Sequence, residues 1–269
     1  MLLFPNAKIN LGLQVTAKRP DGYHDIATVF YPLPVTDMLE VIPASDFSFT
    51  QSGLPVDGAP EKNLCYKAWT LLRDACQLPP IALHLHKQIP LGAGLGGGSS
   101  DAAFTLQLLN KVFQLQLSEQ QLSDYALQLG SDCPFFLLNK PAYATGRGER
   151  LTPVDIPHLN GKKILLLNPG IHISTAWAFA QVQPAAPAVH LPDMVQAPVA
   201  EWKNRLPNDF TAPVFAAHSG LKKLLDWLYA AGALFAGMTG TGATLFGIFD
   251  EWPAANTLPD NCRHWQVAL

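Results

Sequence analysis

The sequence predicts a protein that mixes helices and strands, and three observations support this. Residues 7–16 and 81–89 alternate apolar and polar side chains, which is the pattern of a strand with two different faces. Apolar residues recur at helical spacing over 102–113 and again over 122–129. Five of the twelve residues in 90–101 are glycines, and they separate a predicted strand from a predicted helix.

The composition is that of a compact globular protein. Charged residues make up 14% of the 269 residues and hydrophobic residues 48%, a balance that argues against a disordered chain. The formal net charge of −3 gives no general attraction for nucleic acid or for a membrane surface, so we expect neither as a partner. An anionic substrate must then be bound by local hydrogen-bond donors.

The cysteines and the apolar runs favour a cytoplasmic protein. The four cysteines form no C-x-x-C pair, and free thiols fit a reducing compartment. Pro5, Asn6 and Lys8 interrupt any apolar run near the first residue, so we expect no signal peptide. No run of apolar residues is long enough to predict a transmembrane helix. We expect a monomer or a weak homodimer that acts on a small molecule.

The first predicted strand carries polar side chains on one face. In residues 7–16, Lys8 and Asn10 project together on the face opposite Ile9, about 7 Å apart. The residue types alone favour a solvated strand face over a functional pair.

A turn and several short elements follow. Pro20-Asp21-Gly22 is a typical turn sequence, because proline presets φ and glycine accepts a positive φ. It leads into Tyr23, His24 and a predicted strand over 26–33. Further strands are predicted over 38–42 and 47–51, a loop over 52–60 and a helix over 61–76. We expect that helix to bury Leu64, Ala68, Leu71, Leu72 and Ala75.

The glycine-rich loop suits an anion. Glycine lets the backbone approach a ligand closely, and the start of the next helix adds free N–H donors and a partial positive charge. Ser99 and Ser100 are good N-cap residues for that helix, and they offer hydroxyls to a phosphate. A tight turn with a serine cap needs only one glycine, so a run of five favours an anion site.

Common phosphate-binding loops do not match. No Gly-Lys-Ser/Thr ends the loop, which excludes a Walker A motif. Gly92, Gly94 and Gly97 satisfy the dinucleotide pattern G-x-G-x-x-G, but the acidic residue expected about 20 positions later is missing. The V-A-I-K, H-R-D and D-F-G elements of protein kinases do not occur.

The second half alternates helices and strands. A capping box over 118–121 begins a helix that Gly130 ends. Asp132 follows before Pro134, where an acidic residue is most simply a turn or cap residue. Strands are predicted over 162–167, 233–238 and 244–249, helices over 174–179 and 218–231, and a loop with little regular structure over 183–198.

The glycine loop resembles the second motif of the GHMP kinases, the family of galactokinase and the homoserine, mevalonate and phosphomevalonate kinases. The form Pro-x-Gly-x-Gly-Leu-Gly-Gly-Gly-Ser-Ser-x-Ala-Ala spans 90–103. It is most similar to the branch that phosphorylates 4-diphosphocytidyl-2-C-methyl-erythritol. In the family this loop cradles the triphosphate of ATP. The resemblance implies that the ATP-binding residues are Pro90, Leu91, Gly92, Ala93, Gly94, Leu95, Gly96, Gly97, Gly98, Ser99 and Ser100.

The resemblance runs in collinear order from Pro5 to Phe249 and implies further roles. The opening Pro-x-Ala-Lys-Ile-Asn-Leu implies that Lys8 and Asn10 are active-site residues, Lys8 being catalytic. The segment Gly-x-Asp-x-Pro-Phe-Phe makes Asp132 the catalytic aspartate, which accepts the hydroxyl proton.

Substrate recognition is implied by a second set of residues. Asp-Gly-Tyr-His marks the diphosphocytidyl branch, in which Tyr23 would stack on cytosine and His24 would bond its edge. Phe179 falls where the branch has a second aromatic, although a helix-core role fits it equally well. Thr239 and Gly240 belong to a second glycine loop that resembles the third family motif.

The resemblance also implies the fold and the reaction. It implies an α+β fold with an N-terminal domain like ribosomal protein S5 domain 2 (residues 1–155) and a ferredoxin-like C-terminal domain (residues 156–269). The reaction is phosphoryl transfer from ATP to the 2-hydroxyl of the methylerythritol unit, with Mg²⁺ on the ATP phosphates. Two alternatives remain: another GHMP kinase, for homoserine or mevalonate, and a non-catalytic nucleotide-binding module.

Overall fold

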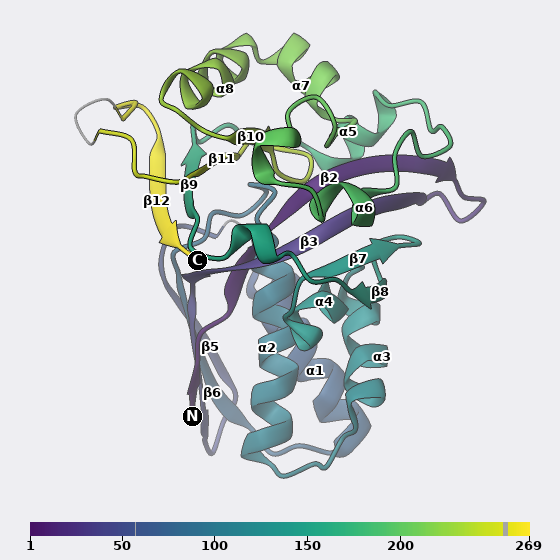
Figure 1. Ribbon diagram of the computed structural model, residues 1–269. Coiled ribbons are helices and arrows are strands. Elements are labelled where there is room, and N and C mark those ends of the chain that lie inside the picture. Colours follow the sequence, from purple (N-terminus) through teal and green to yellow (C-terminus); the bar gives the residue numbers. More distant parts are fainter. Residues whose placement is uncertain (57, 255–257) are drawn as a thin grey trace. The chain divides into compact units, whose positions relative to one another are not determined.

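The structure, a computed structural model, describes residues 1–56, 58–254 and 258–269 (Figure 1). These residues divide into two compact units. The first unit consists of Met1–Lys8, Pro34–Leu91 and Gly96–Lys140, and the second of Ile9–Leu33, Gly92–Leu95 and Pro141–Leu269. Each unit is therefore assembled from segments far apart in the sequence. The expected boundary between two domains, at residues 155 and 156, stays a prediction.

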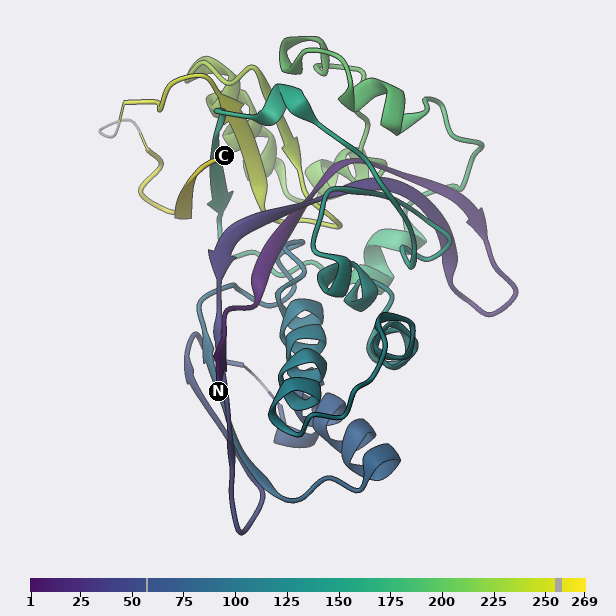
Figure 2. The same ribbon diagram turned by 60° about the horizontal axis from the view of Figure 1, so that its bottom comes forward.

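The first unit is a sheet covered by helices. Its elements are β1 (Leu2–Leu3), β4 (Met38–Pro43), β5 (Ser48–Gly53), a 3₁₀ turn (Pro60–Lys62), α1 (Leu64–Cys76), β6 (Ile81–Lys87), α2 (Gly97–Val112), α3 (Glu119–Leu129) and α4 (Cys133–Leu138). The strand order is β1-β4-β6-β5, with β5 parallel to β6 and the other pairs antiparallel. Figures 1 and 2 both show α1 and α2 side by side against this sheet, and apolar side chains fill the space between.

Helix α1 buries a different face from the predicted one. Ala68 and Leu72 are buried as expected, but Leu64 and Leu71 are only half-buried and Ala75 is exposed. The helix instead turns Cys65 and Trp69 inward. The indole of Trp69 stacks on Phe47 with ring centroids 3.5 Å apart, and burying this large ring rotates the helix away from the predicted stripe.

Helix α2 begins earlier than the serines predicted. Its N-cap is Gly96, at φ 73°, and Gly97 is already helical, so Ser99 and Ser100 lie inside the first turn and the prediction that they cap it is wrong. The physical reason is that glycine accepts the left-handed conformation, which lets the chain enter the helix three residues sooner. A Cβ on Gly96 would also lie 2.8 Å from a ring carbon of Phe136.

A buried ionic cluster joins three segments of the first unit. The Lys87 ammonium, at the end of β6, donates to the carboxylates of Asp37 and, at 2.7 Å, of Asp101 in α2. The second oxygen of Asp37 accepts the N–H groups of Gln88 and Ile89. Lys87, Asp37 and Asp101 are each at most 2% exposed. Oδ1 of Asp101 has no hydrogen-bond partner among the described residues.

This cluster shifts the titration of its members. Burial raises the pKa of Asp101 to about 7, and the Asp37 carboxylate adds to that shift. Burial alone lowers the pKa of Lys87, but the carboxylates of Asp101 and Asp37 outweigh it and raise that pKa. Lys87 therefore keeps its positive charge, while Asp101 is more readily protonated than an ordinary aspartate.

The second unit contains two sheets. Its elements are β2 (Asn6–Lys18), β3 (His24–Thr36), β7 (Ala142–Thr145), β8 (Arg150–Pro153), β9 (Lys163–Asn168), α5 (Thr175–Ala180), α6 (Leu191–Val195), α7 (Thr211–Ala217), α8 (Ser219–Ala230), β10 (Phe235–Met238), β11 (Leu245–Phe249), β12 (Arg263–Ala268) and 3₁₀ turns at Pro157–Leu159 and Val199–Glu201. The ends of β2 and β3, Asn6–Lys8 and Pro34–Thr36, belong to the first unit. One sheet has the order β2-β3-β7-β8, and the other is antiparallel with the order β10-β11-β9-β12.

The order β10-β11-β9-β12 is that of a ferredoxin-like sandwich, as expected for the C-terminal part. Helix α6 lies inside the segment predicted to have little regular structure, and its first turn holds Pro192. A proline at this position is compatible with a helix because the first N–H groups need no intrahelical acceptor. Strand β12 and helix α7 were not predicted.

The polar face of β2 is buried, so the prediction of a solvated strand face is wrong. Lys8, Asn10 and Gln14 are each at most 3% exposed. A strand can bury both faces when its polar atoms find partners, and alternation alone does not distinguish this case from a solvated face.

In the described part of the chain, we find no helix that combines the length and the hydropathy needed to cross a membrane. All four cysteines lie in that part and are free.

The ionic cluster predicts how stability depends on pH. The folded state raises the pKa of Asp101 from about 4 to about 7, so the protonated form is favoured on folding. Its contribution to the free energy of unfolding is full below pH 4 and is lost as the pH rises to 7, by on the order of 1 kcal/mol per pH unit. Asp101→Asn mimics the protonated form, so its stability relative to the parent should increase as the pH rises from about 4 to about 7.

Urea unfolding of both proteins at each pH measures this difference. Asp46→Asn, which removes an exposed carboxylate of the same unit, is the control and should follow the parent at every pH. Parallel curves for Asp101→Asn and the parent would contradict the assignment.

Candidate active site

The start of α2 offers hydrogen-bond donors to an anion. The N–H of Ser100 donates to the carbonyl of Gly96 at 2.9 Å and is the first intrahelical donor. The N–H groups of Gly97, Gly98 and Ser99 precede it, so they have no acceptor within the helix. The helix dipole adds a partial positive charge at the same point. A phosphate fits these donors without a nearby lysine in the loop.

The glycines of this helix start differ in what surrounds them. A Cβ on Gly97 would lie 2.9 Å from the Lys87 Nζ, so this glycine is required by packing. A Cβ on Gly98 would make only ordinary contacts, 3.6 Å from Leu91 and 3.8 Å from Leu64. Ser100 is fully buried, and its hydroxyl has no partner among the described residues. Of the two predicted serine hydroxyls, only that of half-buried Ser99 has access to a ligand.

Lys8 and Asp132 form an ion pair in the first unit. The Lys8 Nζ lies 3.5 Å from Oδ2 of Asp132, and the side chains are 4% and 31% exposed. Asp132 is the N-cap of α4, but its carboxylate accepts no hydrogen bond from that helix, so the side chain does not serve as a cap. Burial lowers the pKa of the Lys8 ammonium, and the attraction of Asp132 offsets only part of that shift.

The same pair lies beside the start of α2. A Cβ built on Gly96 would be 3.1 Å from two carbons of the Lys8 side chain. The structure therefore brings together a buried cation, an accessible carboxylate and the free N–H groups of a helix start. This combination of groups suits the transfer of a charged phosphoryl group to a hydroxyl.

In the second unit, a buried network joins Asn10 to both glycine loops. The Thr239 hydroxyl accepts the N–H of Asn10 at 3.0 Å and lies 3.0 Å from the carbonyl oxygen of Gly94. The Asn10 amide donates to Thr28 at 2.9 Å. A Cβ on Gly94 would overlap the carbonyl oxygen of Thr239, so the two loops approach too closely for any other residue. Gly240 has a positive φ and packs against Gly94.

The aromatic residues gather in the second unit as well. His24 stacks on Phe179 with ring centroids 4.8 Å apart, and Phe179 meets Phe210 edge to face. Phe179 is half-buried, so it is not an enclosed helix-core residue. Tyr23 is 53% exposed, and the guanidinium of Arg147 lies over its ring. With 53% of its surface exposed, Tyr23 is accessible to a planar ligand.

Sequence reasoning missed Lys87, Thr28 and Arg147. A signal for Lys87 was present, because it continues the apolar register of Ile81, Leu83 and Leu85 and so had to point into the core. Thr28 and Arg147 gave no such signal, because their contacts, with Asn10 and Tyr23, are made by segments distant in sequence.

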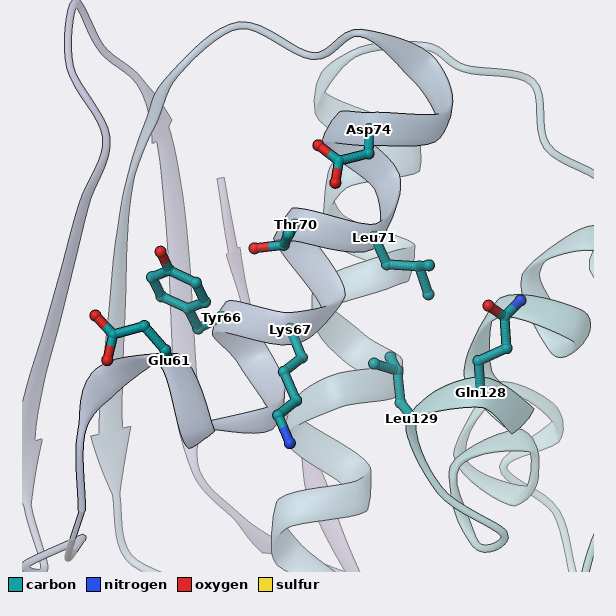
Figure 3. Close-up of a pocket in the computed structure, with 8 residues that line it drawn as sticks. All are labelled: Glu61, Tyr66, Lys67, Thr70, Leu71, Asp74, Gln128 and Leu129. Carbon is teal, nitrogen blue, oxygen red and sulfur yellow. The ribbon is translucent and has the colours of Figure 1, made fainter.

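A cavity of about 380 Å³ opens between α1 and α3 in the first unit (Figure 3). It is lined by Glu61, Tyr66, Lys67, Thr70, Leu71, Asp74, Gln128 and Leu129. None of the predicted catalytic or glycine-loop residues lines it, so it has no part in the assignment of the site.

Comparison with known proteins identifies the fold and the family. The sequence profile for the GHMP kinases N terminal domain matches residues 63–140, and that for GHMP kinases C terminal matches residues 196–265. The crystal structure of a 4-(cytidine 5'-diphospho)-2C-methyl-D-erythritol kinase superposes with a TM-score of 0.79 at 31% identity, covering 99% of this chain and 98% of that one. The Methanococcus jannaschii mevalonate kinase, at 16% identity and a TM-score of 0.66, covers 100% of this chain and 98% of its own and shares the fold. The α+β GHMP kinase fold is thereby confirmed.

Two curated relatives match over essentially their whole length. The 4-diphosphocytidyl-2-C-methyl-D-erythritol kinase of Parabacteroides distasonis is 48% identical, covering 100% of both chains. The enzyme of the same name from Cytophaga hutchinsonii is 49% identical, covering 100% of this chain and 99% of its own. With this identity from end to end and both family profiles matched, the chain belongs to the GHMP kinases and, among them, to the 4-diphosphocytidyl-2-C-methyl-D-erythritol kinase family.

Proposed function

We propose that the chain transfers the γ-phosphoryl group of ATP to the 2-hydroxyl of 4-diphosphocytidyl-2-C-methyl-D-erythritol, in the methylerythritol phosphate route to isoprenoids. The observation that supports this most strongly is the identity of 48% over the full length of both chains. We also propose that it acts in the cytoplasm, as a monomer or a weak homodimer, and its free cysteines fit such a compartment.

The chemistry is assigned to Asp132 and Lys8. The substrate oxygen forms a bond to the γ-phosphorus, the bond from that phosphorus to the β–γ bridging oxygen breaks, and ADP leaves. Asp132 accepts the proton of the hydroxyl; its partly exposed carboxylate is accessible to a substrate. Lys8 is desolvated, and the attraction of Asp132 offsets only part of that effect, so this ammonium would stabilise charge that develops on the transferred group.

The phosphates are assigned to the start of α2, where N–H groups and the helix dipole act on an anion. The ATP-binding segment is proposed to run from Pro90 to Ser100, with the backbone rather than the serine hydroxyls as its main donor set. Asn10, Thr239 and Gly240 are assigned to the substrate side, where their buried network fixes the second glycine loop.

Mg²⁺ is proposed to accompany ATP. The described residues contain no group of three or more His, Cys, Asp or Glu side chains arranged to hold a metal ion. At nucleotide sites Mg²⁺ is usually held by phosphate oxygens, water and only one or two carboxylates. When bound, it would neutralise charge on the β- and γ-phosphates.

The base is assigned to Tyr23, His24 and Phe179. The half-buried His24 ring would bond the edge of cytosine, and the aromatic faces would stack on it. A site built to pair with one base leaves a polar group unpaired when another base is offered.

The first prediction for this function concerns substrate choice. ATP consumption should be fast with the diphosphocytidyl substrate, lower by roughly 10²-fold or more in kcat/KM with the uridine analogue, and absent with mevalonate and homoserine. A coupled ADP assay with the four acceptors measures this. Equal kcat/KM for the cytidine and uridine compounds would remove the roles of Tyr23 and His24, and turnover of mevalonate or homoserine would revive the alternative kinases.

The second prediction concerns the chemical step. Asp132→Asn preserves size and polarity but accepts no proton at neutral pH, so kcat should fall by roughly two to four orders of magnitude with little change in KM. Lys8→Met should fall similarly, and the double variant should be little worse than either single one because the pair acts as a unit. Near-normal kcat in a folded Asp132→Asn protein would remove this residue from the mechanism.

The third prediction concerns the phosphates. Gly98→Val adds a side chain at a point where the protein leaves room, so it should raise the KM for ATP by about tenfold or more, as expected when hydrogen bonds to a charged group are lost. Substitutions at Gly96 and Gly97 are less informative because a Cβ there meets Phe136 or Lys87. Gly220→Val, at the equivalent second helical position of α8 and in open space, is the matched control. An unchanged KM for ATP in Gly98→Val would contradict the assignment of this helix start.

A further inference from the structure

A cation lies on the ring of Tyr23. The Cζ of Arg147 is 4.5 Å from the centroid of that ring. This distance is within the range of a cation–π contact, and arginine makes such contacts more often than lysine. Arg147 comes from the turn between β7 and β8, more than 100 residues after Tyr23, so the fold and not the local sequence joins them.

Hydrogen bonds fix the backbone on both sides of this contact. The N–H of Ile26 donates to the carbonyl of Gly146 at 2.7 Å, which ties the turn to the start of β3. The N–H of Arg147 donates to the Glu149 carboxylate at 2.6 Å. On the other side, the N–H of Tyr23 donates to Asp21 at 3.1 Å. The contact therefore joins two segments of fixed backbone.

The nearby carboxylates have other hydrogen-bonded partners, although Asp21 also attracts the Arg147 guanidinium electrostatically. Asp21 and Asp25 are both paired with Arg19, at 3.0 and 2.9 Å. The Glu149 carboxylate accepts the backbone N–H of Arg147. Arg147 is half-buried, so its guanidinium is partly shielded from water, which strengthens a cation–π contact.

We infer that Arg147 is a positioning residue for the base of the substrate: it packs on one face of Tyr23, holds the ring in one plane, and leaves the opposite face for cytosine. This inference rests on the proposed function, because it assumes that Tyr23 stacks on the base. A ring that is already fixed loses less conformational freedom when a base stacks on it, so the contact strengthens binding without touching the reacting atoms.

Kinetics of Arg147→Gln test the inference. The KM for the diphosphocytidyl substrate should rise roughly 3- to 30-fold, the range of one cation–π contact, while kcat and the KM for ATP stay unchanged. Calorimetric binding of cytidine 5'-diphosphate should weaken by a similar factor. Arg147→Lys keeps a cation and should recover part of the loss. Arg150→Gln, an exposed arginine at the start of β8, is the matched control and should behave like the parent.

A double-mutant cycle distinguishes an action through Tyr23 from a direct contact between Arg147 and the substrate. If Arg147 acts through Tyr23, Arg147→Gln should cause no further loss in a Tyr23→Leu background. Equal losses in both backgrounds, or an unchanged KM in the single variant with an unaltered melting temperature, would overturn the inference. A rise in KM for Tyr23→Leu without one for Arg147→Gln overturns this inference alone. An unchanged KM for Tyr23→Leu would contradict the proposed base site itself, and this inference with it.

Discussion

The first unit depends on one buried cation, the ammonium of Lys87. Lys87 lies at the end of β6 and pairs with two carboxylates from other segments. Asp37 comes from the connection between β3 and β4, and Asp101 from the first turns of α2, so the ammonium links all three segments. A buried ammonium must be paired, and removing both carboxylates would leave its charge uncompensated. The cluster also explains part of the glycine run, since Gly97 has no room for a Cβ above this ammonium. The requirement for glycine at position 97, in the proposed anion site, thus follows partly from the buried ionic cluster.

Different constraints require glycine at different positions of the run. Gly96 adopts a left-handed conformation and begins α2, and Gly94 lets the backbone of Thr239 approach within contact distance. Gly98 has no such neighbour, and its small size fits the ligand access proposed for this helix start. A loop of this kind binds phosphates with backbone N–H groups, and this suits a chain whose net charge of −3 provides no general attraction for anions.

Burial also determines the properties of the proposed catalytic pair, Lys8 and Asp132. Lys8 is almost completely enclosed, whereas Asp132 keeps about a third of its side-chain surface exposed. The enclosed Lys8 ammonium has little water around it that would have to reorient during the reaction. It is therefore preorganised to stabilise charge that develops in the transition state. The exposed carboxylate is the member of the pair that a hydroxyl can reach. This asymmetry arises because Lys8 lies within a buried strand and Asp132 lies at the start of a short helix.

Local patterns in the sequence were sufficient to predict most of the helices and strands. The alternation in β2 and β6 and the capping box of Ser118 and Gln121 all describe interactions between residues close in the chain, and each is present. The N-caps assigned to Ser99 and Ser100, the buried face of α1 and the solvated face of β2 were wrong. Each depended on partners distant in sequence, such as Phe136 beside Gly96 and Phe47 beneath Trp69. Periodicity reports which side chains share a face, but folding brings Asp37 to Lys87 across 50 residues, and this long-range pairing determines which polar groups are buried.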